Sequence, residues 1–477
     1  MKNLSIFKLK ENKARFFTEI LAGITTFITM AYIVVVNPSI IAGAPGSDLY
    51  TSVFVATCLA AFFGTLLTAL IANLPFAQAS GMGLNAFFAF TVMGANGYSY
   101  PAALLIVFIS GMLFILITVV GLREAVIKAI PKNVKTAISA GIGLFIAFIG
   151  LVNSGSGIVV NDESTLLGLV DFSGITDVAN PATMHSVFSA LVIIVGLVVI
   201  GVLHRFKVPG AILLGIAASA CAYWFGGLYI NDTLAEVVRG NLPGNNIEWS
   251  TIGTQFGTWA KTSLGVCFTQ GVQDLFGNGT FMDNLFTIVM VIISFSMVDM
   301  FDTVGTLIGT AQKANMIDEK GNMPRMKEAL LSDSIATAAG AVLGTSTVTT
   351  FVESSAGVSV GGRTGLTSLV TSLGFLVALF LSPFIGYIPG CATAPALIFV
   401  GILMISSVKD LDFDDITEAI PAFVTLTFMP LTYSIANGIA FGLITHLLLK
   451  VLTFKFKDIS IVEIILVALF IVKFVLG

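Results

Sequence analysis

The sequence predicts an all-α polytopic membrane protein with fourteen transmembrane segments, arranged as two inverted repeats of seven segments. Hydrophobic residues make up 56% of the 477 residues and charged residues only 10%, with a mean hydropathy of +0.98. Soluble domains carry about 25% charged residues, so a soluble class is excluded. Two further observations support the membrane class: apolar segments recur along the chain, and basic residues collect in alternate loops.

The apolar segments form two sets of seven, separated by a more polar outer loop over residues 227–283. They cover residues 18–42, 50–73, 78–94, 100–121, 133–152, 183–203 and 208–226, then 284–311, 328–344, 348–362, 364–386, 391–407, 418–435 and 437–454. One more apolar stretch, residues 459–476, carries Glu463 and Lys473. It is either a fifteenth span or a helix along the bilayer surface, and the sequence leaves both alternatives open.

The basic residues predict the orientation, because Lys and Arg collect in cytoplasmic loops. If residues 1–17 are a cytoplasmic N-terminus, 20 of the 23 basic residues lie inside. Arg239 and Lys261 lie outside, and Lys473 is unassigned. We therefore expect a multi-pass protein of the cell membrane with an even number of spans up to residue 455. No small-residue cleavage site follows the first apolar segment, so this segment is interpreted as a retained helix.

Metal and cofactor chemistry is not expected. Four cysteines are widely spaced and lack a CxxC pair; they are Cys58, Cys221, Cys267 and Cys391. Three histidines lie near segment ends without metal-ligand spacing, and we interpret them as interfacial; they are His185, His204 and His446. We predict no bound metal and no nucleic-acid partner.

An internal repeat is indicated by matching residues in the two halves. Pro131 and Gly143 of the fifth segment are each 258 residues before Pro389 and Gly401 of the twelfth. Because seven is odd, two such repeats lie in opposite orientations in the membrane. In inverted-repeat transporters, interrupted segments at matching positions form a site near the bilayer midplane.

The third and tenth segments are the interrupted ones. The tenth contains TTFVESSAGVSVGGRTGLT over residues 349–367, and the third contains FAQASGMGLNAFFAF over residues 76–90. The tenth predicts a short strand followed by a half-helix, and the third is interrupted by Gly81 and Gly83 ahead of the polar Asn85. A carboxylate at bilayer depth costs about 2.5 to 3.5 kcal/mol on insertion scales, so Glu353 marks a binding site. Asn85 precedes it by 268 residues, which agrees with the repeat.

The eighth segment carries Asp299 and Asp302, three residues apart and therefore on one helix face. Two buried carboxylates resist double ionisation, so one is expected to hold a proton at neutral pH. A proton-coupled carrier needs this chemistry. A structural interpretation of Asp299, as a capping group near a helix end, is also open. Asp333 is expected to cap the ninth segment, since Ser332 and Ser334 flank it.

Several motifs in order resemble the nucleobase–cation symporter-2 family, specifically its AzgA-like purine permease branch. They are AGITTFITMAYIVVVNP at 22–38, GMGLNAFFAF at 81–90, DTVGT at 302–306 and TFVESSAGVSVGGRTGLTS at 350–368. The resemblance implies a core domain (18–121 and 284–386) and a gate domain (122–226 and 387–455), which the C-terminal apolar segment (456–477) follows. It also implies proton-coupled uptake of purine bases, with strands of segments three and ten meeting at the substrate, and a homodimer through the gate domains.

The resemblance also implies which residues bind the substrate. Asp302 and Glu353 match the carboxylates that hold the nucleobase, and Asn85 matches the polar position of segment three. Two departures stand out: Thr306 replaces a histidine common in the uracil and xanthine branch, and Ser80 replaces a proline. Proton coupling would then rest on Asp302, Asp299 and Glu353.

Further substrate contacts are expected from the same two segments. Ser354 and Ser355 directly follow Glu353, and Phe87 or Phe88 can stack on the base. Base–aromatic stacking is worth about 1 to 3 kcal/mol. Hypoxanthine and guanine present an N1–H donor that suits the Glu353 carboxylate, so they are favoured, with adenine possible.

Two alternatives from other classes are open. An anion transporter can share the seven-plus-seven architecture, with Arg363 as the basic residue near the tenth-segment break. A membrane-embedded hydrolase would use paired aspartates, which Asp299 and Asp302 superficially provide. Such enzymes usually draw the pair from two helices, whereas these residues lie on one.

Overall fold

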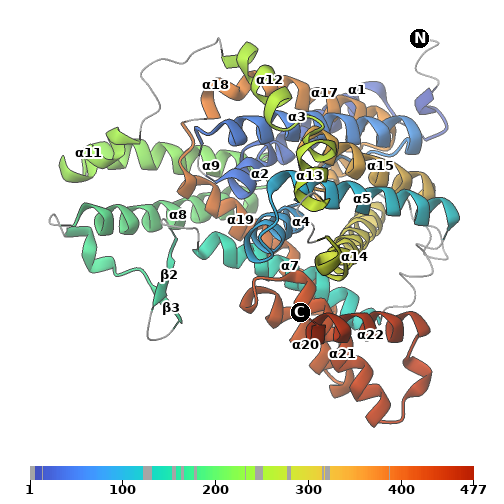
Figure 1. Cartoon of the computed structure of the whole chain (residues 1–477). Helices are drawn as coiled ribbons and strands as arrows, with labels where there is room; N and C mark the ends of the chain where they lie inside the picture. Colours follow the sequence, from blue (N-terminus) through green and yellow to red (C-terminus); the bar gives the residue numbers. More distant parts are fainter. Residues whose placement is uncertain are drawn as a thin grey trace.

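The computed structural model describes most of the chain as helices packed side by side (Figure 1). The described residues are 6–12, 14–43, 45–121, 131–152, 157–162, 166–176, 180–230, 232–241, 251–276, 281–313, 316, 323–385 and 387–476. Basic loop residues such as Arg123, Lys128 and Lys320 lie outside them.

The first half contains the following α-helices, strands and short π or 3-10 helices (η). They are α1 Phe16–Met30, α2 Ile33–Ala42, α3 Asp48–Leu67, η2 Thr68–Ala72, β1 Gln78–Ser80, α4 Met82–Ala86, η3 Phe87–Ala95, α5 Tyr100–Val120, α7 Lys132–Val152, β2 Val159–Asp162, β3 Leu166–Leu169, η4 Phe172–Thr176, α8 Pro181–Arg205, α9 Ala211–Cys221, η5 Ala222–Gly226 and α10 Gly227–Tyr229.

The second half continues in the same way. Its elements are α11 Asp232–Gly240, α12 Thr251–Thr262, η6 Val266–Phe268, α13 Gln270–Phe276, α14 Phe281–Lys313, α15 Met326–Leu343, β4 Val348–Thr350, α16 Ser354–Val360, α17 Gly365–Ala378, η7 Leu379–Leu381, α18 Ser382–Ile385, α19 Gly390–Ile405, η8 Ser406–Asp410, α20 Ile416–Leu431, α21 Ile435–Leu452, η9 Phe456–Asp458 and α22 Ile461–Leu476.

The helical membrane class is confirmed, whereas the count of fourteen spans stays a prediction. Within the described part of the chain, ten helices are long and apolar enough to cross a membrane. Three shorter apolar helices cover Met82–Ala95, Ile416–Leu431 and Ile461–Val472. The tenth segment cannot reach that length as one helix, because its only helix, α16, has seven residues.

Segments three and ten are broken as predicted, and the two breaks meet. Strand β1 pairs with β4 in antiparallel register, with Gln78 opposite Thr350 and Ser80 opposite Val348. All six strand residues are buried. Each strand is followed within a few residues by a helix, α4 after β1 and α16 after β4. Extended backbone at bilayer depth is tolerated only where protein surrounds it, and here the strands satisfy each other.

The predicted repeat positions Gly143 and Gly401 also meet, on α7 and α19. A Cβ atom on Gly143 would lie 2.9 Å from the Gly401 carbonyl oxygen, so the two backbones touch. Around this contact α7 packs on α19, α20 and α21, and α19 also packs on α8 and α9. Helices α1, α3, α5, α15, α16 and α17 pack mainly with one another. The division into core and gate domains stays a prediction.

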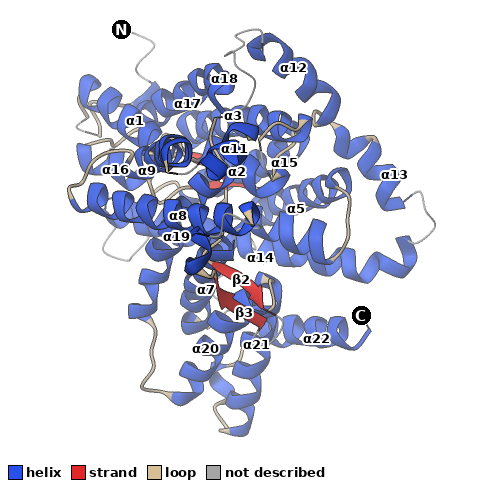
Figure 2. Ribbon diagram, turned by 90° about the vertical axis from the view of Figure 1, so that its left-hand side faces the viewer, coloured by secondary structure: helices blue, strands red, loops and turns tan. Residues whose placement is uncertain are grey.

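Two connections predicted as loops contain regular structure. The outer loop 227–283 forms α11, α12 and α13, and the Trp259 indole donates a 2.7 Å hydrogen bond to the Leu343 carbonyl at the end of α15. The connection between α7 and α8 forms the β2–β3 hairpin, which Figures 1 and 2 show beside the helices.

The C-terminal stretch is a helix, α22, that packs on α21 and α14. Its Glu463 is fully buried, and the Glu463 Oε1 lies 2.6 Å from His446 Nδ1 of α21. His446 is 1% exposed, so the expectation that it is interfacial is wrong. The charged partner at residue 463, seventeen residues later in the chain, was not visible from the spacing of histidines alone.

Candidate functional site

Glu353 lies between β4 and α16, at the break in the tenth segment. The Tyr32 hydroxyl donates a 2.7 Å hydrogen bond to Glu353 Oε1. Tyr32 lies in the two-residue turn between α1 and α2, where the backbone keeps helical dihedral angles. Tyr32 is fully buried and Glu353 is half-buried. The carboxylate is therefore held by a neutral donor and is partly exposed.

Asp302 of α14 lies beside β4, the strand that precedes Glu353. Thr349 of β4 places its hydroxyl 3.5 Å from Asp302 Oδ2. The carboxylates of Asp333 and Glu353 are close enough to interact electrostatically with Asp302. The structure thus brings together the two carboxylates that the sequence singled out.

Asp299 belongs to a neighbouring polar network inside the helices. The Thr303 hydroxyl lies 2.9 Å from Asp333 Oδ1 and 3.4 Å from Asp299 Oδ1. Thr337 lies 3.4 Å from Asp299 Oδ2. Asp299, Asp333, Thr303 and Thr337 are all buried.

The expected capping role of Asp333 is wrong. It lies well inside α15, which begins at Met326 after Arg325, so it cannot cap that helix. The flanking serines donate to carbonyls one turn back, Ser332 to Glu328 and Ser334 to Leu330. A flanking serine pair indicates a helix start only when the boundary is known, and the boundary lies eight residues upstream.

Asn85 lies in α4, one turn after β1, and is fully buried. Its amide donates to the Ser80 carbonyl at 3.2 Å, and its oxygen accepts from Ser346. The Ser80 side chain pairs with Thr345 at 2.7 Å. Serine in place of proline therefore leaves the strand intact.

Ser354 holds the two breaks together, because its hydroxyl accepts a 2.9 Å hydrogen bond from the Ala77 amide. Ser355 is half-buried one residue further along α16. The two phenylalanines of η3 lie in aromatic contacts: Phe87 packs on Phe295 with centroids 4.8 Å apart, and Phe88 on Tyr100 at 6.2 Å. A stacking role for Phe87 or Phe88 stays a prediction.

Sequence reasoning missed Glu19, which organises the far end of α16. Its buried carboxylate accepts hydrogen bonds from the Arg363 amide (2.8 Å) and from the hydroxyls of Thr364 (2.8 Å) and Thr367 (2.7 Å). It thereby caps the start of α17 from another helix. The available signal was an acidic residue inside the first apolar segment, FFTEILAG.

Arg363 lies at the opposite end of α16 from Glu353. Its guanidinium donates 2.7 Å hydrogen bonds to the Val358 and Gly362 carbonyls. These are carbonyls at a helix C-terminus, where positive charge is favourable. The arginine thus stabilises the break and is directed to the protein backbone.

Paired breaks at matching places in two halves of a helical membrane protein, with a carboxylate at one break and another beside it, define a membrane transport protein. The chain belongs to the permease family, whose model matches residues 17–441. This confirms the resemblance to the nucleobase–cation symporter-2 family. The family consists of permeases, so the hydrolase alternative is wrong.

Full-length relatives have similar sequences. The chain is 41% identical to the adenine permease AdeP of Escherichia coli (strain K12), over 98% of this chain and 95% of that protein. It is 41% identical to the guanine/hypoxanthine permease PbuO of Bacillus subtilis (strain 168), over 98% and 99%. It is 38% identical to the guanine/hypoxanthine permease PbuG of the same organism, over 99% of both chains.

The fold is shared with transporters of distant sequence. The transmembrane domain of the cyanobacterial bicarbonate transporter BicA superposes with a TM-score of 0.60 at 13% identity, covering 88% of this chain and 96% of that domain. SLC26A9 superposes with a TM-score of 0.56 at 10% identity, covering 93% and 66%. This likeness concerns the fold alone.

Proposed function

We propose that this protein takes up purine nucleobases across the cell membrane in symport with protons. The observation that carries the proposal is Glu353, a carboxylate held by Tyr32 at the junction of two broken segments, with Asp302 beside it. The names of the full-length relatives, adenine permease and guanine/hypoxanthine permease, support the substrate class.

Glu353 suits the Watson–Crick edge of a neutral purine. An ionised carboxylate offers about four lone-pair positions, and we assign Glu353 to accept the N1–H of hypoxanthine or guanine beside its bond from Tyr32. Guanine adds its amino group as a second donor. Asn85, Ser354 and Ser355 lie on the helices that follow β1 and β4, and we assign them to the substrate site as well.

Proton coupling is assigned to Asp302, Asp299 and Glu353, with Asp333 as a neighbour. Thr303 lies between Asp299 and Asp333 but has a single hydroxyl proton to donate. Thr303 therefore donates to one of these two carboxylates at a time. In addition, Asp302 lies near two other acidic groups, Asp333 and Glu353.

Transport would proceed by alternating access between the expected core and gate domains, with the N-terminus in the cytoplasm. A homodimer through the gate domains follows from the family resemblance. The proton is the coupling ion, and no cofactor is required.

Anion transport is the second candidate, because the fold is shared with a bicarbonate transporter. In the sequence, Arg363 was the basic residue near the tenth-segment break that could hold an anion. In the structure, its guanidinium donates hydrogen bonds to backbone carbonyls at the far end of α16. The charged group at the tenth-segment break is the Glu353 carboxylate, with the Asp302 carboxylate beside it, and carboxylates repel anions. Purine transport is therefore the better explanation of this site.

Uptake by the purified protein in liposomes tests the proposal. Labelled hypoxanthine should accumulate when the outside is acidic, and a protonophore should abolish the accumulation. Unlabelled guanine, adenine and xanthine, added as competitors, rank the substrates, and labelled bicarbonate tests the anion alternative. Bicarbonate uptake without accumulation of any purine would overturn the proposal.

A further inference from the structure

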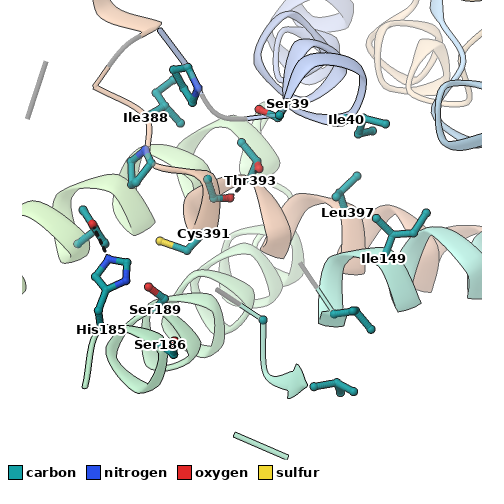
Figure 3. A pocket seen from close by; sticks show the side chains of 18 of the residues that line it. Ser39, Ile40, Ile149, His185, Ser186, Ser189, Ile388, Cys391, Thr393 and Leu397 are labelled. Atoms are coloured by element: carbon teal, nitrogen blue, oxygen red, sulfur yellow. Dashed lines mark hydrogen bonds between the residues drawn. The ribbon is translucent and has the colours of Figure 1, made fainter. Parts of the chain in front are cut away.

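A cavity of about 850 Å³ lies away from the carboxylate site, between α8, α19, η5 and the end of α2 (Figure 3). Neither Asp302 nor Glu353 lines it, and among the described residues its lining contains no Asp, Glu, Lys or Arg. It is therefore a separate space with a neutral wall.

Every wall of the cavity comes from the same end of the molecule. Ser39 lies in the last turns of α2, His185 and Ser186 in the first turns of α8, and Thr393 in the first turn of α19. Following the predicted spans from a cytoplasmic N-terminus, each of these ends faces outside. The cavity thus belongs to the outer side of the membrane.

The cavity also joins the two packing groups of helices. Ser39 of α2 and Phe90 of η3 belong with the group that contains α3 and α5, because α2 packs on α3 and η3 packs on α5, whereas Ile149 and Ser189 come from α7 and α8. A ligand in this space would contact both groups at once, as a substrate on its way to the central site must do.

Several hydroxyls offer hydrogen-bond acceptors to the cavity. Ser39, Ser186 and Thr393 donate their own protons to carbonyls within their helices, at 2.9, 3.0 and 2.9 Å respectively. Their oxygens keep lone pairs for a ligand donor.

Two other groups offer donors. Tyr223 accepts a 3.1 Å hydrogen bond from Asn241, so its own proton can go to His185 Nε2, 2.8 Å away. His185 Nδ1 then carries the ring proton. The Ser189 hydroxyl is fully buried, lies beside the Cys391 thiol, and has no oxygen or nitrogen partner among the described residues.

A neutral wall with both donors and acceptors, together with the aromatic rings of Phe90 and Tyr433, suits a flat, uncharged, polar heterocycle. An anion would find no positive charge there. We propose that this cavity is an outer capture site, where a neutral purine base binds before it moves to Asp302 and Glu353. The proposal rests on the proposed function and adds a second binding step to it.

Thiol protection tests the capture site in the full-length protein. The background is Cys221→Ser, which removes the exposed native cysteine. Ser186→Cys in this background places a half-buried thiol on the cavity wall, and a small membrane-impermeant methanethiosulfonate is added from outside. Hypoxanthine should slow the modification at least about threefold. Ser406→Cys, at the end predicted to be cytoplasmic, is the control and should not react.

The concentration dependence separates the two sites. Adding Glu353→Gln should weaken hypoxanthine binding at the Asp302 and Glu353 site about 5- to 150-fold. The hypoxanthine concentration that half-protects the introduced thiol should stay unchanged. Adding Ser189→Ala should raise that concentration severalfold and raise KM for entry, with the maximal rate retained.

Two outcomes overturn the capture site: no protection in a Ser186→Cys variant that still takes up hypoxanthine, or a half-protecting concentration that shifts in parallel with the Glu353→Gln affinity. By contrast, a wild-type protein that fails to take up any purine would overturn the proposed function itself.

Discussion

Tyr32 and Glu353 are 321 residues apart in the chain, yet the Tyr32 hydroxyl donates a 2.7 Å hydrogen bond to the Glu353 carboxylate. The contact joins the turn between α1 and α2 in the first segment to the break in the tenth. It makes the candidate substrate carboxylate a positioned group, since its rotamer is held by a buried partner.

Replacing Glu353 by Gln should weaken substrate binding. The amide supplies one acceptor where the base edge and Tyr32 need two, so we expect a loss of about 1 to 3 kcal/mol, or about 5- to 150-fold in affinity for hypoxanthine. Equilibrium binding to purified protein measures this. Tyr32→Phe is the matched variant, which keeps the carboxylate and should cost less. Wild-type affinity in Glu353→Gln would remove this residue from the substrate site.

Replacing Asp302 by Asn should uncouple transport from the proton gradient. Asparagine imitates the protonated state permanently, so accumulation driven by a pH gradient should be lost while exchange of base for base persists. Liposomes with an imposed pH gradient provide both measurements.

Asp299→Asn is the comparison for Asp302, and it should shift the pH dependence of uptake with a smaller loss of accumulation. Asp333→Asn should act similarly, because Thr303 lies between Asp299 and Asp333. If Asp302→Asn concentrates hypoxanthine as well as the wild type does, another residue carries the proton, and Glu353 becomes the leading candidate.

The backbone contact between Gly143 and Gly401 predicts a position that does not tolerate a side chain. Gly401→Val would push α19 away from α7 and should destabilise the protein by about 1 to 3 kcal/mol. The thermal midpoint of the protein in detergent reports this loss. Gly201→Val on α8 is the matched control, because a Cβ atom there meets no described atom within 4 Å. Equal midpoints for the two variants would show that the α7–α19 contact is not tight.

The pair of His446 and Glu463 should fasten α22 to α21. Glu463→Leu leaves His446 with Glu418, whose Oε1 is 3.6 Å from Nε2, so we expect a loss below the roughly 3 to 5 kcal/mol typical of a broken buried pair. The double variant His446→Leu with Glu463→Leu should recover part of the lost stability, since no buried charge then remains unpaired at this contact. Strict additivity of the two single losses would argue against a direct interaction.

The sequence by itself determined the membrane class and the two broken segments. It also singled out the carboxylates Asp302 and Glu353 as candidate site residues. These follow from local properties: hydropathy, glycine spacing and the high cost of a charge in an apolar segment. The offset between Asn85 and Glu353 also indicated that the two breaks correspond.

The tertiary structure decided which groups meet. Tyr32 and Glu19 both lie in the first segment, but Tyr32 binds Glu353 of the tenth and Glu19 caps the start of α17 in the eleventh. Asp333 lies beside Thr303 of α14 instead of capping its own helix. His446 likewise finds Glu463 in the interior. Hydrogen-bond partners depend on the packing of helices that are distant in the chain, and periodicity along a single segment carries no information about that packing.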